Sequence, residues 1–122
     1  MKLAGLFIAG SVTGLIAVGS ASAHHSAAMF DRNKEVVLTG VIKEFQWTNP
    51  HSWIQIEAPI DGKVQEWSVE AGSPNTLART GWRPTIFKPG DKVSIKINPM
   101  KDGSPGGSFV GATLADGKTL GR

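Results

Sequence analysis

One long run of strand-forming residues, with a glycine in its middle, restricts the fold of this chain most. The run extends from Glu35 to Trp47, EVVLTGVIKEFQW, and is rich in β-branched and aromatic side chains, which favour strands. Gly40 interrupts it, and an interior glycine often marks a bend or a bulge in a strand. We therefore expect one long strand that bends at Gly40 as it curves around a small barrel.

Further strand signals follow along the chain. Apolar and polar residues alternate from Ser52 to Glu57, and after the turn signal PIDG at 59–62 a third segment, Val64 to Glu70, is expected to pair back as a hairpin. Lys92 to Asn98 alternates cleanly, and Ser108 to Ala115 has the composition of a last strand. Together with the first run, the sequence predicts five strands.

One short helix is predicted between the third and fourth strands, from Pro74 to Thr80. Ser73 is a good N-cap, proline suits the first helical position, and Gly81 suits the left-handed position beyond the end. Trp82 and Phe87 are expected to pack beneath this helix.

The order of three strands, a helix and two strands is typical of the OB-fold. We predict a mainly β protein, a small five-stranded OB-fold-like Greek-key barrel with one short helix between strands 3 and 4, preceded by a signal-peptide helix. Strands and helices do not alternate along the chain, which argues against a parallel α/β sheet. A β-sandwich with a crossing helix is the main alternative. The chain has no cysteine, so no disulfide can stabilise it.

The N-terminal segment has the layout of a secretory signal peptide. Lys2 provides the positive start, residues 3–18 are apolar or small, and Ala21-Ser22-Ala23 provides an A-x-A cleavage pattern. The apolar run falls short of the ~20 strongly apolar residues that a membrane-spanning helix needs. We predict cleavage after Ala23 and a periplasmic location, with membrane contact only through the uncleaved signal peptide.

Cleavage at this bond would divide the chain into three parts. Residues 1–23 are the predicted signal peptide, 24–34 an N-terminal arm and 35–122 a single β-barrel domain. The formal net charge of +3 is spread along the chain and forms no basic stripe, so nucleic acid is not expected as a partner. The expected partner is a small ligand or a periplasmic protein.

Four stretches of the chain carry a family resemblance when they are taken together. They are AHHSAAMFD, TGVIKEFQWTNPHSW, WSVEAGSPNTLARTGW and KPGDKVSIKINPMKDGSPGG, and they span nearly all of residues 24–120. In this combination the chain resembles a family of small exported bacterial proteins classed as a domain of unknown function. The resemblance implies a periplasmic location and a small β-rich fold, and it brings no activity, cofactor or catalytic residue.

The histidines suggest a metal site. Cleavage at the predicted bond would make His24 the first residue, so that its α-amine and its ring nitrogen would chelate one ion together. His51, in the loop motif TNPHSW, would add a third nitrogen, an arrangement that suits Cu(II). His25, Met29 and Met100 are further candidate ligands. The alternative is a solvated arm at 24–25, with His51 only supporting its loop through one ring hydrogen bond.

A second candidate site is aromatic. Trp47 and Trp53 flank the TNPHS break, with Asn49 between them, and an exposed pair would stack on a sugar, a base or another aromatic ligand. The alternative is packing in the core and the loop, the role that we expect for Trp67 and Trp82.

The sequence contains no recognisable set of catalytic residues. Glu57, Glu66 and Glu70 are expected on outward strand faces, and Ser52 beside His51 forms no triad because neighbours on a strand point to opposite faces. We predict an exported, non-enzymatic β-barrel module that binds copper through the mature N-terminal histidine. The alternative is a protein- or glycan-interaction module that uses the Trp47–Trp53 edge without metal.

Overall fold

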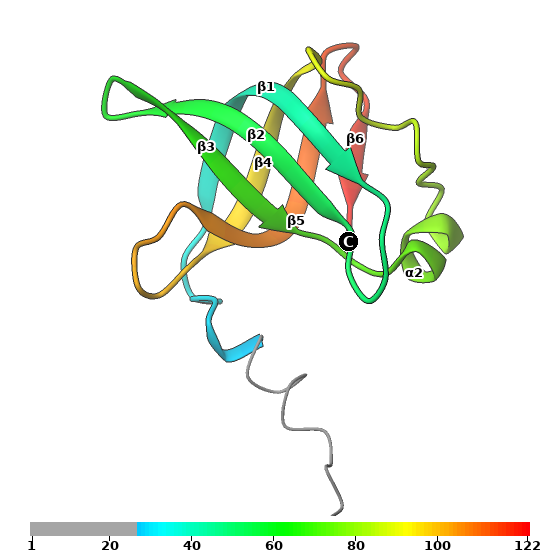
Figure 1. Cartoon of the computed structure of the whole chain (residues 1–122), viewed down its shortest axis with the longest axis horizontal. Coiled ribbons are helices and arrows are strands. Elements are labelled where there is room, and N and C mark those ends of the chain that lie inside the picture. Colours follow the sequence, from blue (N-terminus) through cyan, green and yellow to red (C-terminus); the bar gives the residue numbers. More distant parts are fainter. Residues whose placement is uncertain (1–26) are drawn as a thin grey trace, which may run out of the picture.

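The computed structural model describes residues 27–122, which form a closed barrel with a short sixth strand on its outside (Figure 1). Strands are hydrogen-bonded in the order β3-β2-β1-β4-β5-β6, and the end of β3 also pairs in parallel with the start of β5, which closes the ring. The predicted five-stranded OB-type barrel is confirmed. The strands are β1 (Val36–Gln46), β2 (Trp53–Ile60), β3 (Lys63–Glu70), β4 (Lys92–Pro99), β5 (Gly106–Leu114) and β6 (Thr119–Gly121).

The predicted signal peptide and the two histidines that follow it lie outside the described residues. Within residues 27–122, no helix is long and apolar enough to cross a membrane. The described part of the arm is attached to the barrel at the β4–β5 loop. Phe30 is buried and forms an isolated bridge with Met100, and the Lys101 N–H donates to the Met29 carbonyl at 2.8 Å.

Strand β1 joins the two halves of the barrel. Residues 36–41 pair with β4, and residues 41–46 pair with β2. The register with β2 shifts between Ile42 and Glu44, so of the two alternatives that Gly40 suggested, a bend or a bulge, the bulge lies at Lys43 instead. The strand nevertheless changes partners as expected for a strand that curves around a small barrel.

Gly40 has a different role from the one expected. It lies next to the position where β1 passes from β4 to β2, and a Cβ at this position would collide with the backbone carbonyl of Glu57 on β2. Gly40 is therefore required by the close approach of another backbone rather than by a bulge.

Helix α2 (Pro74–Arg79) begins as predicted and ends one residue earlier. The Ser73 hydroxyl accepts a hydrogen bond from the Thr76 N–H at 3.3 Å, which caps the helix. Leu77 is the buried residue of the helix, and it joins the barrel core. Figure 1 shows α2 after β3, at one side of the barrel.

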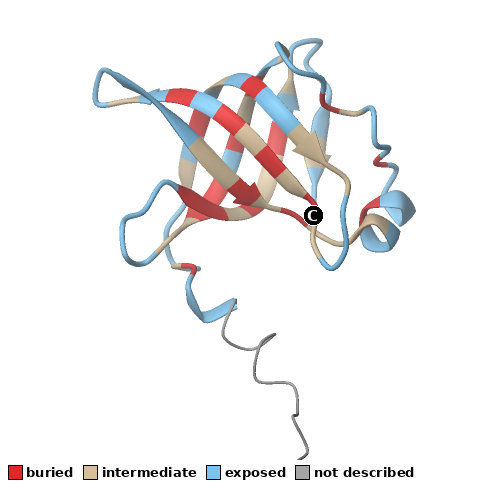
Figure 2. Cartoon of the chain, viewed as in Figure 1, coloured by how far each residue is buried: buried red, intermediate tan, exposed pale blue. Residues whose placement is uncertain are grey.

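The core fills the barrel, and the strand residues alternate between buried and exposed (Figure 2). Trp82 lies in the core as predicted, with 1% of its surface exposed, and its ring packs against that of Phe87 with centroids 5.6 Å apart. Trp67, also predicted in the core, is only partly buried at its border, and its indole Nε1 has no hydrogen-bond partner among residues 27–122. Strand β6 was not predicted from the sequence. It follows the turn at residues 116–117 and pairs with β5.

Candidate functional site

Two of the sequence motifs lie side by side at one end of the barrel. TNPHSW covers the β1–β2 loop and the start of β2, and EAGSPN covers the end of β3 and the start of α2. The Ser52 N–H donates to the Gly72 carbonyl at 2.9 Å, and the Ala71 N–H donates to the Ser52 carbonyl at 2.8 Å. Backbone hydrogen bonds therefore hold the end of the β1–β2 loop against the end of β3.

His51 contacts a carboxylate on the neighbouring segment. Its Nδ1 lies 3.3 Å from Oε1 of Glu70, and the side chains of His51 and Glu70 are 42% and 11% exposed. The Thr48 hydroxyl donates to the His51 carbonyl at 2.7 Å, which supports the loop backbone. The imidazole is held on its Nδ1 side, which leaves Nε2 for a ligand.

Glu70 is the residue of this site that sequence reasoning missed. It was expected on an outward face as a solvated carboxylate, like Glu57 and Glu66, which are exposed. Glu70 instead is nearly buried, opposite Trp53 in the β2–β3 register. The predicted hairpin could have indicated this contact. It places Glu70, at the end of β3, beside the start of β2, and β2 begins two residues after His51.

Unlike His51, whose side chain is 42% exposed, Ser52 is shielded from solvent. Its side chain is fully buried, and its hydroxyl has no hydrogen-bond partner among the described residues. An unpaired buried hydroxyl is destabilising by about 1–3 kcal/mol relative to a satisfied one.

Ser52→Ala is therefore expected to leave the free energy of unfolding unchanged or to raise it by up to about 1 kcal/mol. Urea denaturation followed by circular dichroism measures this change. A decrease of the free energy of unfolding by about 2 kcal/mol or more would show that the hydroxyl has a partner that matters for stability. That is roughly the value of a buried hydrogen bond to a charged group.

The predicted aromatic pair is divided between two environments. Trp47 packs edge-to-face against Phe45, with ring centroids 5.9 Å apart, at the border of the core. Trp53 lies on the outer face of β2, partly exposed, between Gln46 of β1 and Glu70 of β3. Asn49 is exposed in the loop. A stacking surface at this end of the barrel would therefore be formed by Trp53.

The outer face of β1, β2 and β3 is acidic around the Glu57–Glu66 pair, four residues along β2 from Trp53. The Lys43 ammonium contacts the Glu66 carboxylate at 2.6 Å. This hydrogen bond and the charge of Glu66, together with the charges of Glu57 and Glu44, raise the pKa of Lys43 above its ordinary value. One lysine thus lies among three exposed carboxylates.

Met29 and Met100, the two methionines expected as candidate metal ligands, lie close together. They line one hollow of about 300 Å³ beside the β4–β5 loop, with Asp102 among the other lining residues. The Ser104 N–H and hydroxyl both donate to the Asp102 carboxylate and lower its pKa. The hollow results from the bridge that attaches the arm to the barrel.

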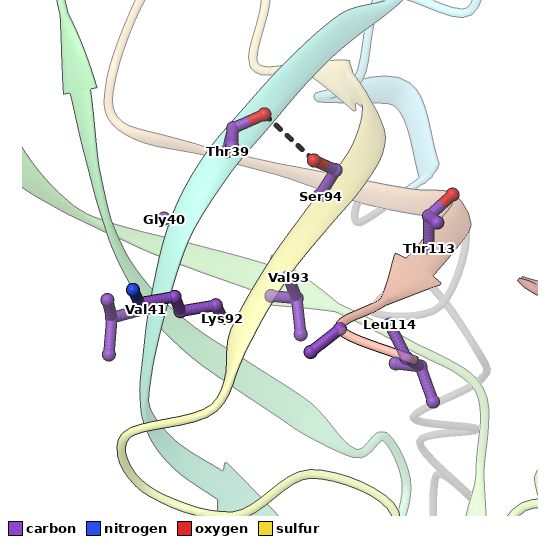
Figure 3. A pocket seen from close by; sticks show the side chains of 9 residues that line it. Thr39, Gly40, Val41, Lys92, Val93, Ser94, Thr113 and Leu114 are labelled. Atoms are coloured by element: carbon purple, nitrogen blue, oxygen red, sulfur yellow. Dashed lines mark hydrogen bonds between the residues drawn. The ribbon is translucent and has the colours of Figure 1, made fainter. Parts of the chain in front are cut away.

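Another hollow lies on the outside of β1, β4 and β5 (Figure 3). The hydroxyls of Thr39 and Ser94 hydrogen-bond to each other at 2.9 Å there, and Lys92 is its charged residue. None of the predicted site residues lines it. Within residues 27–122, no three His, Asp or Glu side chains are placed to hold a metal ion together.

Comparison with known proteins identifies the family. A model described as "Family of unknown function (DUF6152)" matches residues 14–109. The chain belongs to this family. No curated protein matches the chain.

Among solved structures, the mitochondrial single-stranded DNA binding protein Rim1 from S. cerevisiae is similar to this DUF6152 chain. The two share 13% sequence identity with a TM-score of 0.49, and the match covers 67% of this chain and 94% of Rim1. The expectation that excluded nucleic acid as a partner is corrected, because a small net charge that is spread along the chain is not sufficient ground for that exclusion. The similarity at this level concerns the fold and assigns no ligand to the DUF6152 chain.

Proposed function

We propose that this DUF6152 chain is an exported, non-enzymatic module that binds copper, with His51 as the ligand from the barrel and His24 as the ligand from the arm. The contact between His51 Nδ1 and Glu70 Oε1, at 3.3 Å, supports this proposal most directly. Histidines that bind metals usually hold a carboxylate or a carbonyl at their second ring nitrogen, which orients the ring and raises its basicity.

The donor set explains the choice of metal. Cleavage after Ala23 gives His24 a free α-amine beside its imidazole, and these two nitrogens with Nε2 of His51 make three nitrogen donors. Nitrogen donors in a tetragonal arrangement suit Cu(II). The chain has no cysteine for a thiolate zinc site.

A Cu(II) titration of the chain that begins at His24 tests the proposal. We expect one ion per chain, with an electron paramagnetic resonance spectrum typical of nitrogen ligands. One extra alanine before His24, or His51→Ala, is expected to weaken binding at least about 100-fold, and Glu70→Gln about 10–100-fold, the range found for partners of metal ligands.

Two variants serve as matched controls for this titration. Asn49→Ala changes an exposed residue of the same loop, and Trp53→Ala changes the neighbouring aromatic side chain. Neither is expected to alter copper affinity. Equally weak binding by the chain beginning at His24 and by the extended chain would contradict the proposal, and so would full affinity in His51→Ala.

A second candidate function is an interaction module centred on Trp53. The partly exposed indole, which lies among polar side chains on the same sheet face as an acidic cluster, supports it, because such a surface suits stacking on a sugar ring or contact with a partner protein. In this case Trp53→Ala abolishes binding to the partner, whereas removal of copper has no effect.

A further inference from the structure

A recess separate from the methionine hollow lies between the arm, the β3–α2 connection and β5. Its volume is about 230 Å³, and Arg32, Glu70, Ser108 and Arg122 are among its lining residues. This volume is below the ~300–1,000 Å³ of most ligand pockets, so the recess suits a small ligand. It brings together residues from both ends of the described chain.

The guanidinium of Arg122 is held in place by oxygen acceptors. Its Nε donates to the Phe109 carbonyl at 2.8 Å, and its Nη2 donates to Oδ1 of Asn98 at 2.5 Å. Asn98 is itself 5% exposed, and its Nδ2 donates to the Lys34 carbonyl at 2.8 Å. A guanidinium has five N–H donors, so the fixed group of Arg122 keeps donors for a ligand.

The two arginines of the recess form no ion pair within the described residues. Neither Arg32 nor Arg122 belongs to one of the ion pairs of residues 27–122. The carboxylate that lines the recess is that of Glu70, and it already contacts His51. Two arginines thus face one carboxylate that has another partner, which favours an anionic ligand.

The remaining lining of the recess is largely apolar. Leu77, Phe109 and Ala71 are buried members of the core that also border the recess. An anion that fills it therefore needs an apolar body as well as an acceptor group. Inorganic phosphate would leave this apolar surface without a partner.

We propose that the recess binds a small organic carboxylate. The carboxylate lies against Arg32 and Arg122, because a guanidinium fork matches its two oxygens, and the apolar body lies against Phe109 and Leu77. This site requires no metal and does not depend on the copper proposal.

Calorimetric titration of the chain with benzoate tests this site, with benzylamine and inorganic phosphate as comparison probes. We expect saturable binding of one benzoate, and a loss of about tenfold or more in affinity for Arg32→Gln and for Arg122→Gln, as for a charge-assisted hydrogen bond. Arg32 is exposed, so Arg32→Gln tests the charge without disturbing the core. Arg79→Gln, an exposed position of α2 outside the recess, is the matched control and is expected to bind as the unchanged chain.

Three outcomes would overturn the inference. The first is the absence of saturable benzoate binding up to millimolar concentrations. The second is equal benzoate affinity in both arginine variants and in the unchanged chain. The third is binding of phosphate or benzylamine as tight as that of benzoate, which would show that the apolar lining or the arginines do not select the ligand.

Discussion

Trp82→Ala is expected to lower the free energy of unfolding by about 3–5 kcal/mol, the usual range for removing a large buried aromatic side chain. Trp82 is 1% exposed, and its ring meets Phe109 and Phe87 edge-on at centroid distances of 5.0 and 5.6 Å. The ring of Phe45 lies at a centroid distance of 6.2 Å. The surrounding rings belong to separate elements, so they cannot all close over the cavity that the substitution leaves.

Urea denaturation monitored by circular dichroism measures this loss. Trp53→Ala is the matched control, because Trp53 is the same residue type on the outer face of β2. We expect that substitution to reduce the free energy of unfolding by about 1 kcal/mol, as is common for a single substitution outside the core. Equal losses for the two variants would contradict the central position of Trp82 in the core.

Gly40→Ala is expected to destabilise the barrel by about 1–3 kcal/mol or more. The new methyl group would collide with the Glu57 carbonyl, which belongs to the backbone of β2 and cannot rotate away as a side chain would. Relief requires β1 and β2 to separate close to the start of their pairing, at Val41 and Glu57.

Thermal unfolding of Gly40→Ala and Gly121→Ala checks this expectation. Gly121 also lies in a strand, but a Cβ there meets nothing within 4 Å. We expect the midpoint temperature to fall in Gly40→Ala and to stay near its original value in Gly121→Ala. An unchanged midpoint in Gly40→Ala would mean that β1 and β2 have room to adjust.

The local elements of the fold were largely predictable. The strand segments and the capped helix depend on alternation and on capping residues, signals carried by neighbours a few positions apart. A glycine in a strand marks a bend, a bulge or the close approach of another backbone, and the sequence alone does not distinguish these alternatives. Only the pairing of Gly40 beside Glu57 decides between these alternatives.

The candidate site was only partly predictable. His51 and Trp53 were named from the loop motif, and Met29 and Met100 from their chemistry. Glu70 was predicted to be solvent-exposed. The alternation of apolar and polar residues indicates on which face of a strand a side chain lies, but not which other segment covers that face. The end of β3 meets the β1–β2 loop, and this contact buries the carboxylate against His51.

By itself, the sequence determined that this chain forms a small strand-rich barrel with one capped helix, because those choices depend on residues close together along the chain. The tertiary structure decided which groups meet. It brought His51 to Glu70, Met29 to Met100, and Arg32 into one recess with Arg122. His51 meets Glu70 across the β2–β3 hairpin. The members of the other two pairs are much farther apart along the chain, and they meet only because the arm is attached to the barrel.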